Sequence, residues 1–281
     1  MTAVSFSSVL IRKADAPPLA IAFWRNALAA SVLLPLALIF RRNEFRALDA
    51  GRFRVALLAG ALLAAHFATW VPSLSFTTVA ASAVLVTTQP VWIAVFGRLI
   101  GERIGGRALA GIGLALAGTA VISGGDFAAS GRALFGDALA LTGAVCAAGY
   151  FLAGRSLRQE VSLLTYVGIV YTTTAVLLAG AMVVSGTPFT GFPAGTWVVL
   201  VLLTVGPQLL GHTVFNYLLG HLETAVVAVA IMAEPVGATI LAFLILQETP
   251  PATAVAGGVI ILAGVYLAIV AQARARVAAP T

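Results

Sequence analysis

The chain has 281 residues, of which 60% are hydrophobic and only 9% are charged, and its mean hydropathy is +1.04. Soluble proteins carry about a quarter charged residues, so this composition excludes a water-soluble domain and indicates a chain that crosses a membrane several times. The single cysteine, Cys146, excludes a disulfide framework, and the net charge of +6 comes from basic residues in short breaks between apolar runs. We therefore predict no cofactor, no metal site and no nucleic-acid partner.

Long charge-free intervals divide into helices of about 20 residues, the length needed to cross a bilayer core of about 30 Å. Dense turn chemistry at Gly186, Pro188, Gly191 and Pro193 separates two of them. In chain order, the predicted crossings are residues 17–40, 53–73, 78–99, 107–124, 133–155, 162–185, 194–217, 223–246 and 252–272.

A further apolar segment, residues 1–11, is too short to cross a membrane. It does not resemble a signal peptide either, because Arg12 and Lys13 follow its apolar run instead of preceding it. We interpret it as the second part of a shortened first helix. The predicted fold class is therefore all-α integral membrane, with ten transmembrane helices.

Loop charges predict the orientation, because cytoplasmic loops collect Lys and Arg. With both termini in the cytoplasm, the outer side receives only Arg12, Lys13 and Arg132, and Arg25 falls within a helix. The inner side then receives Arg41, Arg42, Arg46, Arg52, Arg54, Arg98, Arg103, Arg107, Arg155, Arg158, Arg274 and Arg276. We expect an integral protein of the bacterial cytoplasmic (inner) membrane with both termini cytoplasmic.

The two parts of the chain resemble each other. A shift of about 145 residues places residues 78–90 over 223–235, and one more residue of shift places His66 over His212 and Glu102 over Glu248. Each part then holds five helices, residues 1–125 and 126–281. An odd number of helices inverts the second copy, so we predict two inverted repeats, an arrangement typical of secondary transporters.

Several segments in this order resemble the drug/metabolite transporter superfamily, EamA type. They are residues 24–30, the helix ending at Pro90, residues 101–103, Gly111 to Gly118, residues 225–235, residues 246–248 and Gly257 to Gly264. Gln247 departs from the resemblance, since the family usually has Gly before this Glu, and the usual opening Trp-Gly pair is missing. The resemblance implies ten helices and movement of small metabolites, usually by export.

The predicted function is a secondary active transporter that moves small metabolites, amino acids among the candidates, by alternating access. Protons or another ion are the candidate coupling partners, and lipid surrounds the chain. The alternatives are a non-transporting membrane assembly or partner protein and, ranked last, an intramembrane enzyme. An enzyme is not predicted because the chain lacks clustered catalytic motifs, and a Gly-x-x-x-x-Gly-Lys nucleotide loop is also missing.

Ionisable groups inside apolar spans are candidate functional residues. Glu234, whose repeat mate is Gln89, could bind a cationic group or exchange a proton, or be a neutral or Arg-paired structural residue. Arg25 could attract a substrate carboxylate, pair with Glu234 or extend to the membrane surface. His66 and His212 are candidate proton relays or packing residues.

Aromatic and amide side chains are candidates to line a substrate cavity, with anchoring at the membrane surface as the alternative. Pro90 and Pro235 are predicted to mark kinked helices that support gating. Gly111, Gly113, Gly118, Gly257, Gly258 and Gly264 are predicted to form a close helix contact between the two halves. The candidate cavity residues of this kind are Trp24, Trp70, Trp92, Asn216 and Tyr217, with Tyr150 and Tyr166.

Overall fold

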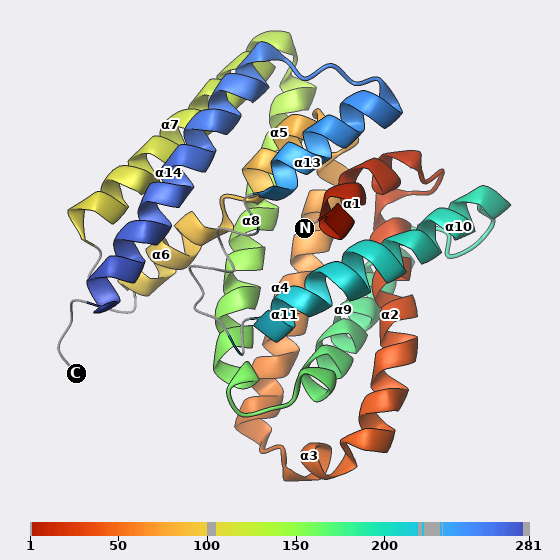
Figure 1. The fold of residues 1–281 in the computed structure, drawn as a ribbon. Coiled ribbons are helices and arrows are strands. Elements are labelled where there is room, and N and C mark those ends of the chain that lie inside the picture. The colour runs from red at the N-terminus through yellow and green to blue at the C-terminus, as the bar shows by residue number, and fades with distance from the viewer. Residues whose placement is uncertain (1, 100–104, 219–220, 222–230, 232, 278–281) are drawn as a thin grey trace.

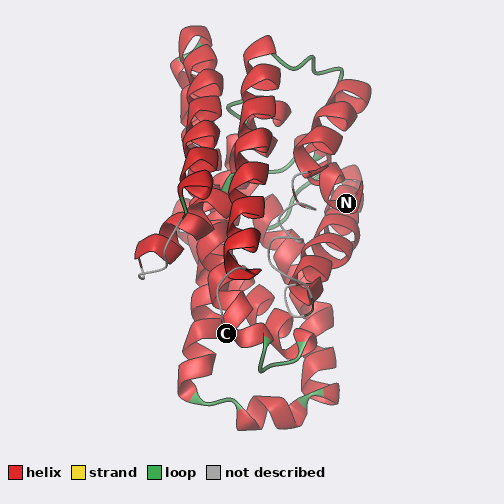
Figure 2. Ribbon diagram, turned by 60° about the vertical axis from the view of Figure 1, so that its left-hand side comes forward, coloured by secondary structure: helices red, strands yellow, loops and turns green. Residues whose placement is uncertain are grey.

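The computed structural model describes residues 2–99, 105–218, 221, 231 and 233–277, and within these residues the chain forms helices and no strands (Figures 1 and 2). The helices of the first half are α1 (Thr2–Lys13), α2 (Pro18–Phe40), α3 (Arg42–Ala47), α4 (Ala50–Ser73), α5 (Val79–Val86), α6 (Gln89–Leu99) and α7 (Gly106–Ala129). Those of the second half are α8 (Gly131–Arg158), α9 (Leu163–Ser185), α10 (Ala194–Leu203), η1 (Thr204–His212), α11 (Thr213–Leu218), α13 (Ala233–Leu241), η2 (Ala242–Leu246) and α14 (Ala252–Val277).

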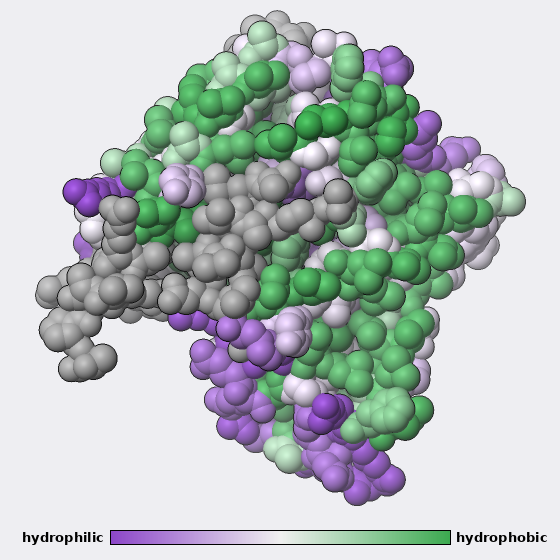
Figure 3. Space-filling view, in the orientation of Figure 1, coloured by the Kyte–Doolittle hydropathy of each residue, from purple (hydrophilic) through white to green (hydrophobic). Residues whose placement is uncertain are grey.

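Seven helical segments in the described residues are long and apolar enough to cross a membrane. They correspond to the predicted crossings except 107–124 and 223–246. The first of these is present as part of α7, whose apolar stretch Leu109–Ser123 is shorter, and the second begins on residues outside those described and continues as the apolar Glu234–Leu246. The chain is therefore an integral membrane protein, and its hydrophobic surface covers the helices above the hydrophilic α3 end in Figure 3.

The predicted continuous helix 78–99 is interrupted, and Pro90 explains the interruption. Proline has no N–H, and its ring clashes with the carbonyl four residues earlier. That carbonyl belongs to Val86, where α5 ends, and turns at Thr87 and Thr88 precede α6. The kink predicted at Pro90 is therefore a full break in the helix. The residues before Pro235 lie largely outside the described part of the chain, so the equivalent prediction has no structural counterpart here.

The predicted helix 194–217 also departs from regular α-geometry. Pro207 cannot donate a hydrogen bond, and around it the chain adopts the wider π-type turns of η1 before α-geometry resumes in α11. Thr213 closes this stretch by donating from its backbone N–H to the carbonyl of Gln208. Within this stretch Gln208 is buried and His212 is half-buried.

The helices form two packed groups (Figure 1). α4 packs against α8 and α9, and α2 packs along α9, which together form the larger group. α7 and α14 lie side by side as a separate pair, in contact over most of their length. α1 packs on α13 and η1, so the N-terminal helix lies against elements from the second half of the chain.

Glycines explain the close approach of α7 and α14. A Cβ at Gly111 would lie 2.5 Å from the carbonyl oxygen of Gly264, and one at Gly118 would lie 2.7 Å from that of Gly257. These contacts run the two helices antiparallel with their backbones touching. We call these four residues the glycine seam. Gly113, also predicted to be part of the contact, has nothing within 4 Å of a Cβ and faces away.

Candidate functional site

A narrow cavity lies in the bundle between elements from both halves of the chain. Its volume is about 30 Å³, which is room for a few water molecules but not for a metabolite. It is lined by Leu63, His66, Trp70, Val86, Thr87, Gln89, Ala147, Tyr150, Phe151, His212, Phe215, Ile231 and Glu234. The cavity therefore brings together six of the predicted candidate residues, namely His66, Trp70, Gln89, Tyr150, His212 and Glu234.

The break between α5 and α6 positions one wall of this cavity. Thr87 lies in the break and Gln89 immediately follows it, and both line the cavity. Glu234, two residues into α13, lines the cavity as well and is only 8% exposed. Its backbone carbonyl accepts a hydrogen bond of 3.4 Å from the Ser5 hydroxyl on α1. Gln89 and Glu234 thus approach the same cavity from opposite halves of the chain.

The two predicted histidines are neighbours, with ring centroids 6.4 Å apart. Nδ1 of His66 lies 2.9 Å from the carbonyl oxygen of Gly143. The His66 ring also stacks on the Trp70 ring, with 5.6 Å between the ring centroids. A carbonyl can only accept, so Nδ1 of His66 carries a proton and Nε2 of the neutral ring is an acceptor. His66 is therefore held in one orientation by the α8 backbone.

Arg25 lies in a buried polar layer next to the cavity. It is 0% exposed, so it does not extend to the membrane surface as one alternative predicted. Its Nε donates to Oε1 of Gln208 at 2.9 Å, its Nη1 donates to the Ser7 hydroxyl at 3.2 Å, and its guanidinium carbon lies 4.3 Å from the ring centroid of Phe67. Within the described residues Arg25 forms no ion pair, so the predicted pairing with Glu234 does not occur in this conformation.

Gln208 is the central residue of this layer and was not among the predicted site residues. It is 0% exposed, accepts from Arg25, and donates from Nε2 to Oδ1 of Asn26 at 3.1 Å. Asn26 in turn donates from Nδ2 to the carbonyl of Ala22 at 2.8 Å. The signal that could have found Gln208 is its position: it is a neutral amide within a long charge-free span and directly follows Pro207.

The remaining predicted aromatic and amide residues divide into two groups. Asn216 is buried one layer behind the cavity, where its Oδ1 accepts from the cavity-lining Tyr150 hydroxyl at 2.7 Å. Trp24, Trp92 and Tyr217 lie away from the cavity. Trp24 donates to the carbonyl of Phe189 at 2.7 Å and Trp92 to the Thr88 hydroxyl at 3.3 Å.

Tyr217 lines a wider groove of about 660 Å³ at the α3 end of the molecule. This groove lies between α2, α9 and α11 and includes Arg41 and Ser162. It opens at the end that the loop charges predict to be cytoplasmic. Tyr217 is 47% exposed, which separates it from the buried residues of the cavity.

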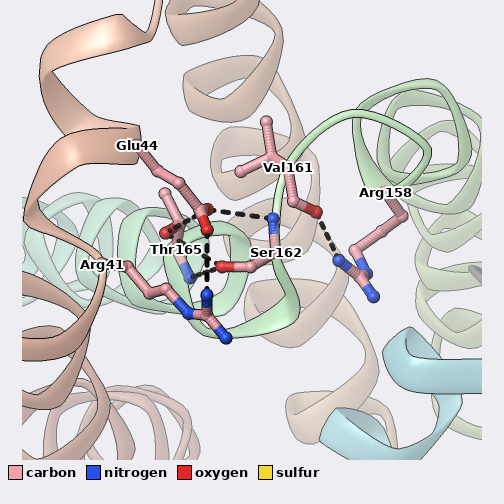
Figure 4. Close-up of polar contacts among 6 residues, drawn as sticks. All are labelled: Arg41, Glu44, Arg158, Val161, Ser162 and Thr165. Carbon is pink, nitrogen blue, oxygen red and sulfur yellow. Dashed lines mark hydrogen bonds and ion pairs between the residues drawn. The ribbon is translucent and has the colours of Figure 1, made fainter.

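At that same end a carboxylate joins the two halves (Figure 4). Glu44 of α3 accepts from the backbone N–H of Ser162 at 3.1 Å and from the Thr165 hydroxyl at 2.9 Å, at the start of α9. Arg41 lies 3.6 Å from the same carboxylate. Partial burial favours the protonated form of Glu44, but the hydrogen bonds from Ser162 and Thr165 outweigh it, so the pKa of Glu44 is lowered.

Glu248 makes the corresponding connection at the opposite end. Its Oε1 accepts from the backbone N–H of Val79 at 2.6 Å, at the start of α5, and its Oε2 pairs with Arg12 at 3.1 Å. Arg12 also donates to the carbonyl of Leu74. Glu248 therefore stabilises the start of a helix in the first half of the chain.

Comparisons with known proteins point to membrane transporters. The family model of EamA-like transporters matches residues 1–124 and 134–270. The chain is 28% identical over 273 residues to an uncharacterized transporter of Archaeoglobus fulgidus, with 95% of this chain and 93% of that protein covered. A crystal structure of 20% sequence identity has the same fold, with a TM-score of 0.66 over 95% of this chain and 94% of the other.

Proposed function

The chain belongs to the EamA-like transporter family, and we propose that it is a secondary active transporter that exports a small metabolite by alternating access to the central cavity. The observation that carries this proposal is the cavity itself. Elements of both halves line it, and it holds three titratable groups, the buried Glu234 and His66 and the half-buried His212, where an apolar membrane bundle would otherwise hold none.

We further propose that residues 1–125 and 126–281 are inverted repeats related by a twofold axis in the membrane plane. The glycine seam supports this. At a shift of 146 residues Gly111 corresponds to Gly257 and Gly118 to Gly264, and the contact of Gly111 with Gly264 recurs as that of Gly257 with Gly118. Such an exchange is what a twofold axis between the helices requires. The two segments matched by the family model agree with this division.

The histidines support the same axis. His66 and His212 correspond to each other at this shift, and their rings are neighbours. A residue next to its own repeat mate lies close to the axis. The cavity is thus located where the two repeats meet, as in transporters whose substrate site lies at the repeat interface.

The small size of the cavity supports alternating access. A site with room for only a few water molecules must widen to admit a metabolite, and the groove at the α3 end is a path along which it could do so. We infer from the loop charges that this end and both termini face the cytoplasm, in the bacterial inner membrane. Loading from that side corresponds to export.

We propose that Glu234 carries the coupling proton, with His66 and His212 beside it. A carboxylate in the cavity can take up and release a proton when the cavity opens to each side in turn. Gln89, from the other half, presents a neutral amide in the same cavity and cannot titrate. Proton exchange would then belong to one repeat only.

Purified protein in liposomes with an imposed pH gradient tests this function. The accumulation of a panel of amino acids, nucleosides and amphipathic amines is measured for the wild type and for Glu234→Gln. If Glu234 carries the proton, the variant loses gradient-driven accumulation but retains exchange of unlabelled for labelled substrate. Glu160→Gln, which removes an exposed carboxylate beside Arg52, is the matched control and should behave as the wild type. Unchanged accumulation by Glu234→Gln would overturn the role of Glu234, and transport of nothing in the panel would count against the function.

A further inference from the structure

The layer around Phe67 contains hydrogen-bond donors that lack acceptors. Nη2 of Arg25 and Nε1 of Trp70 are both buried, and among the described residues neither has a hydrogen-bond partner. Both groups can only donate. An unpaired buried donor costs about 1–3 kcal/mol, so two of them in one layer indicate a ligand that supplies acceptor oxygens.

The charge of Arg25 also indicates a ligand with acceptor oxygens. Its two hydrogen-bond partners, Gln208 and Ser7, are neutral, and among the described residues no carboxylate lies within ion-pair distance of the guanidinium. A buried charge without an opposite charge is costly, and it is stabilised most by a hydrogen-bonded anion. These two partners and the Phe67 ring hold the guanidinium in place and leave Nη2 free.

Phe67 connects both donors to the cavity. Its ring centroid is 4.3 Å from the guanidinium carbon of Arg25, 6.4 Å from the Trp70 ring and 5.5 Å from the His212 ring. Trp70 and His212 line the cavity, whereas Arg25 lies one layer behind it. Movement of the Phe67 side chain would therefore place Arg25 within reach of a molecule in the cavity.

We propose that the transported substrate carries a carboxylate, which is bound by Arg25 and by the indole N–H of Trp70, and that an apolar part of the substrate packs on the aromatic wall formed by Trp70, Tyr150 and Phe151. This inference rests on the proposed function and names the substrate class of the same cavity. Arg25 and Trp70 are then the residues that select acids over their neutral analogues.

Phenylacetate and phenylacetamide are suitable probes, because they differ only in the charged carboxylate. Binding to the purified wild-type protein is measured by calorimetry and by the shift in melting temperature. We expect phenylacetate to bind at least tenfold more tightly than phenylacetamide, since charge-assisted hydrogen bonds are about twice as strong as neutral ones. Equal affinities would overturn the proposal.

Trp70→Phe is the sharpest variant, because it keeps an aromatic ring in the cavity wall and removes only the unpaired donor. We expect about tenfold weaker binding of phenylacetate with an unchanged or raised melting temperature of the unliganded protein. Trp92→Phe is the matched control, since Nε1 of Trp92 already has Thr88 as its partner and the ring lies outside the cavity. Unchanged phenylacetate affinity in Trp70→Phe would contradict the assignment.

Arg25→Lys keeps the charge but loses the planar guanidinium, and we expect it to weaken phenylacetate binding at least tenfold. If this variant does not fold, the result for Trp70→Phe still decides the question.

Liposome flux of the same two probes separates this inference from the function. Transport of the amide as fast as the acid would overturn the carboxylate site and leave the transporter intact, whereas selective binding of the acid without flux would do the reverse.

Discussion

The glycine seam and the layer around Arg25 both join the first half of the chain to the second, but their chemistry is opposite. In the seam, the backbones of the two helices touch at the glycines, and the side chains of Ile122 and Ile261 pack beside them. In the Arg25 layer, polar side chains from α1, α2 and η1 join the helices through hydrogen bonds. Contacts between backbones tolerate little displacement, whereas hydrogen-bonded side chains can exchange partners. The seam is therefore suited to hold the halves together while the layer beside the cavity rearranges.

The largest expected effect comes from breaking the seam. In Gly118→Leu, the new Cβ would lie 2.7 Å from the carbonyl oxygen of Gly257, and the two helices would have to separate. We expect a loss of about 3 kcal/mol or more in stability, seen as a lower melting temperature in detergent or as loss of folded protein. Gly113→Leu on the same helix, where a Cβ has open space, is the control. Equal damage by both variants would contradict the special role of the seam.

The stability of the Arg25 layer should depend on hydrogen bonding and not on the size of the side chains. Gln208→Leu is similar in volume but leaves Nε of Arg25 and Oδ1 of Asn26 without partners, so we expect a loss of about 2–3 kcal/mol. Gln208→Glu restores an acceptor for Arg25 and should recover most of that stability. Thermal unfolding of the two variants side by side measures the difference. If the leucine variant were as stable as the glutamate variant, the layer would not depend on hydrogen bonding.

The α3 end should add a pH dependence that the seam lacks. The pKa of Glu44 is lowered in the folded chain, so its contribution is present above the pKa of the unfolded chain and is lost as the pH falls through the lowered value. Because Glu44 is partly exposed, we expect only about 1 kcal/mol at neutral pH. The melting temperature of the wild type should fall towards that of Glu44→Gln below about pH 4. A constant difference between the two proteins down to pH 3 would contradict this.

The smallest effect concerns the end of η2. Gln247 has a φ of 56° and is the one residue other than glycine with positive φ in the described part of the chain. Side chains disfavour this left-handed conformation, so Gln247→Gly should raise the stability by up to about 1 kcal/mol, less the lost hydrogen bond from Gln247 to Leu244. A small rise in melting temperature is expected, and a fall would show that this hydrogen bond matters more than the strain.

Much of the fold was predictable because hydropathy and turn residues act locally. Residues 17–40 and 162–185 were predicted within a residue or two of α2 and α9; α2 begins at a proline and ends before Arg41, and α9 lies between Ser162 and Gly186. The π-type turns of η1 were not predicted, although Pro207 was visible in the sequence. A proline indicates that a helix is disturbed. It does not predict which donors the neighbouring carbonyls will find, because that depends on packing against other helices.

The candidate site was predicted in part, for a related reason. Charged and imidazole groups in apolar spans are conspicuous, so Glu234, His66 and His212 were found and do share one cavity. Trp24 was not distinguishable from Trp70 by sequence, because both lie within helices. Only the three-dimensional arrangement shows that Trp24 contacts Phe189 and Trp197 instead. Gln208 was missed because a neutral amide carries less of a cost in a membrane span than a charge does.

The π-type turns of η1 set the angular position of everything that follows them in this membrane span. Because each such turn takes up more residues than an α-turn, α11 is rotated about the helix axis relative to a regular continuation of α10. In this geometry Asn216 accepts a hydrogen bond from the hydroxyl of Tyr150 at 2.7 Å. If η1 were to rewind into α-geometry, α11 would turn about its axis and carry the cavity-lining Phe215 and its neighbour Asn216 with it, so the span from Ala194 to Leu218 can turn part of one cavity wall without moving as a whole.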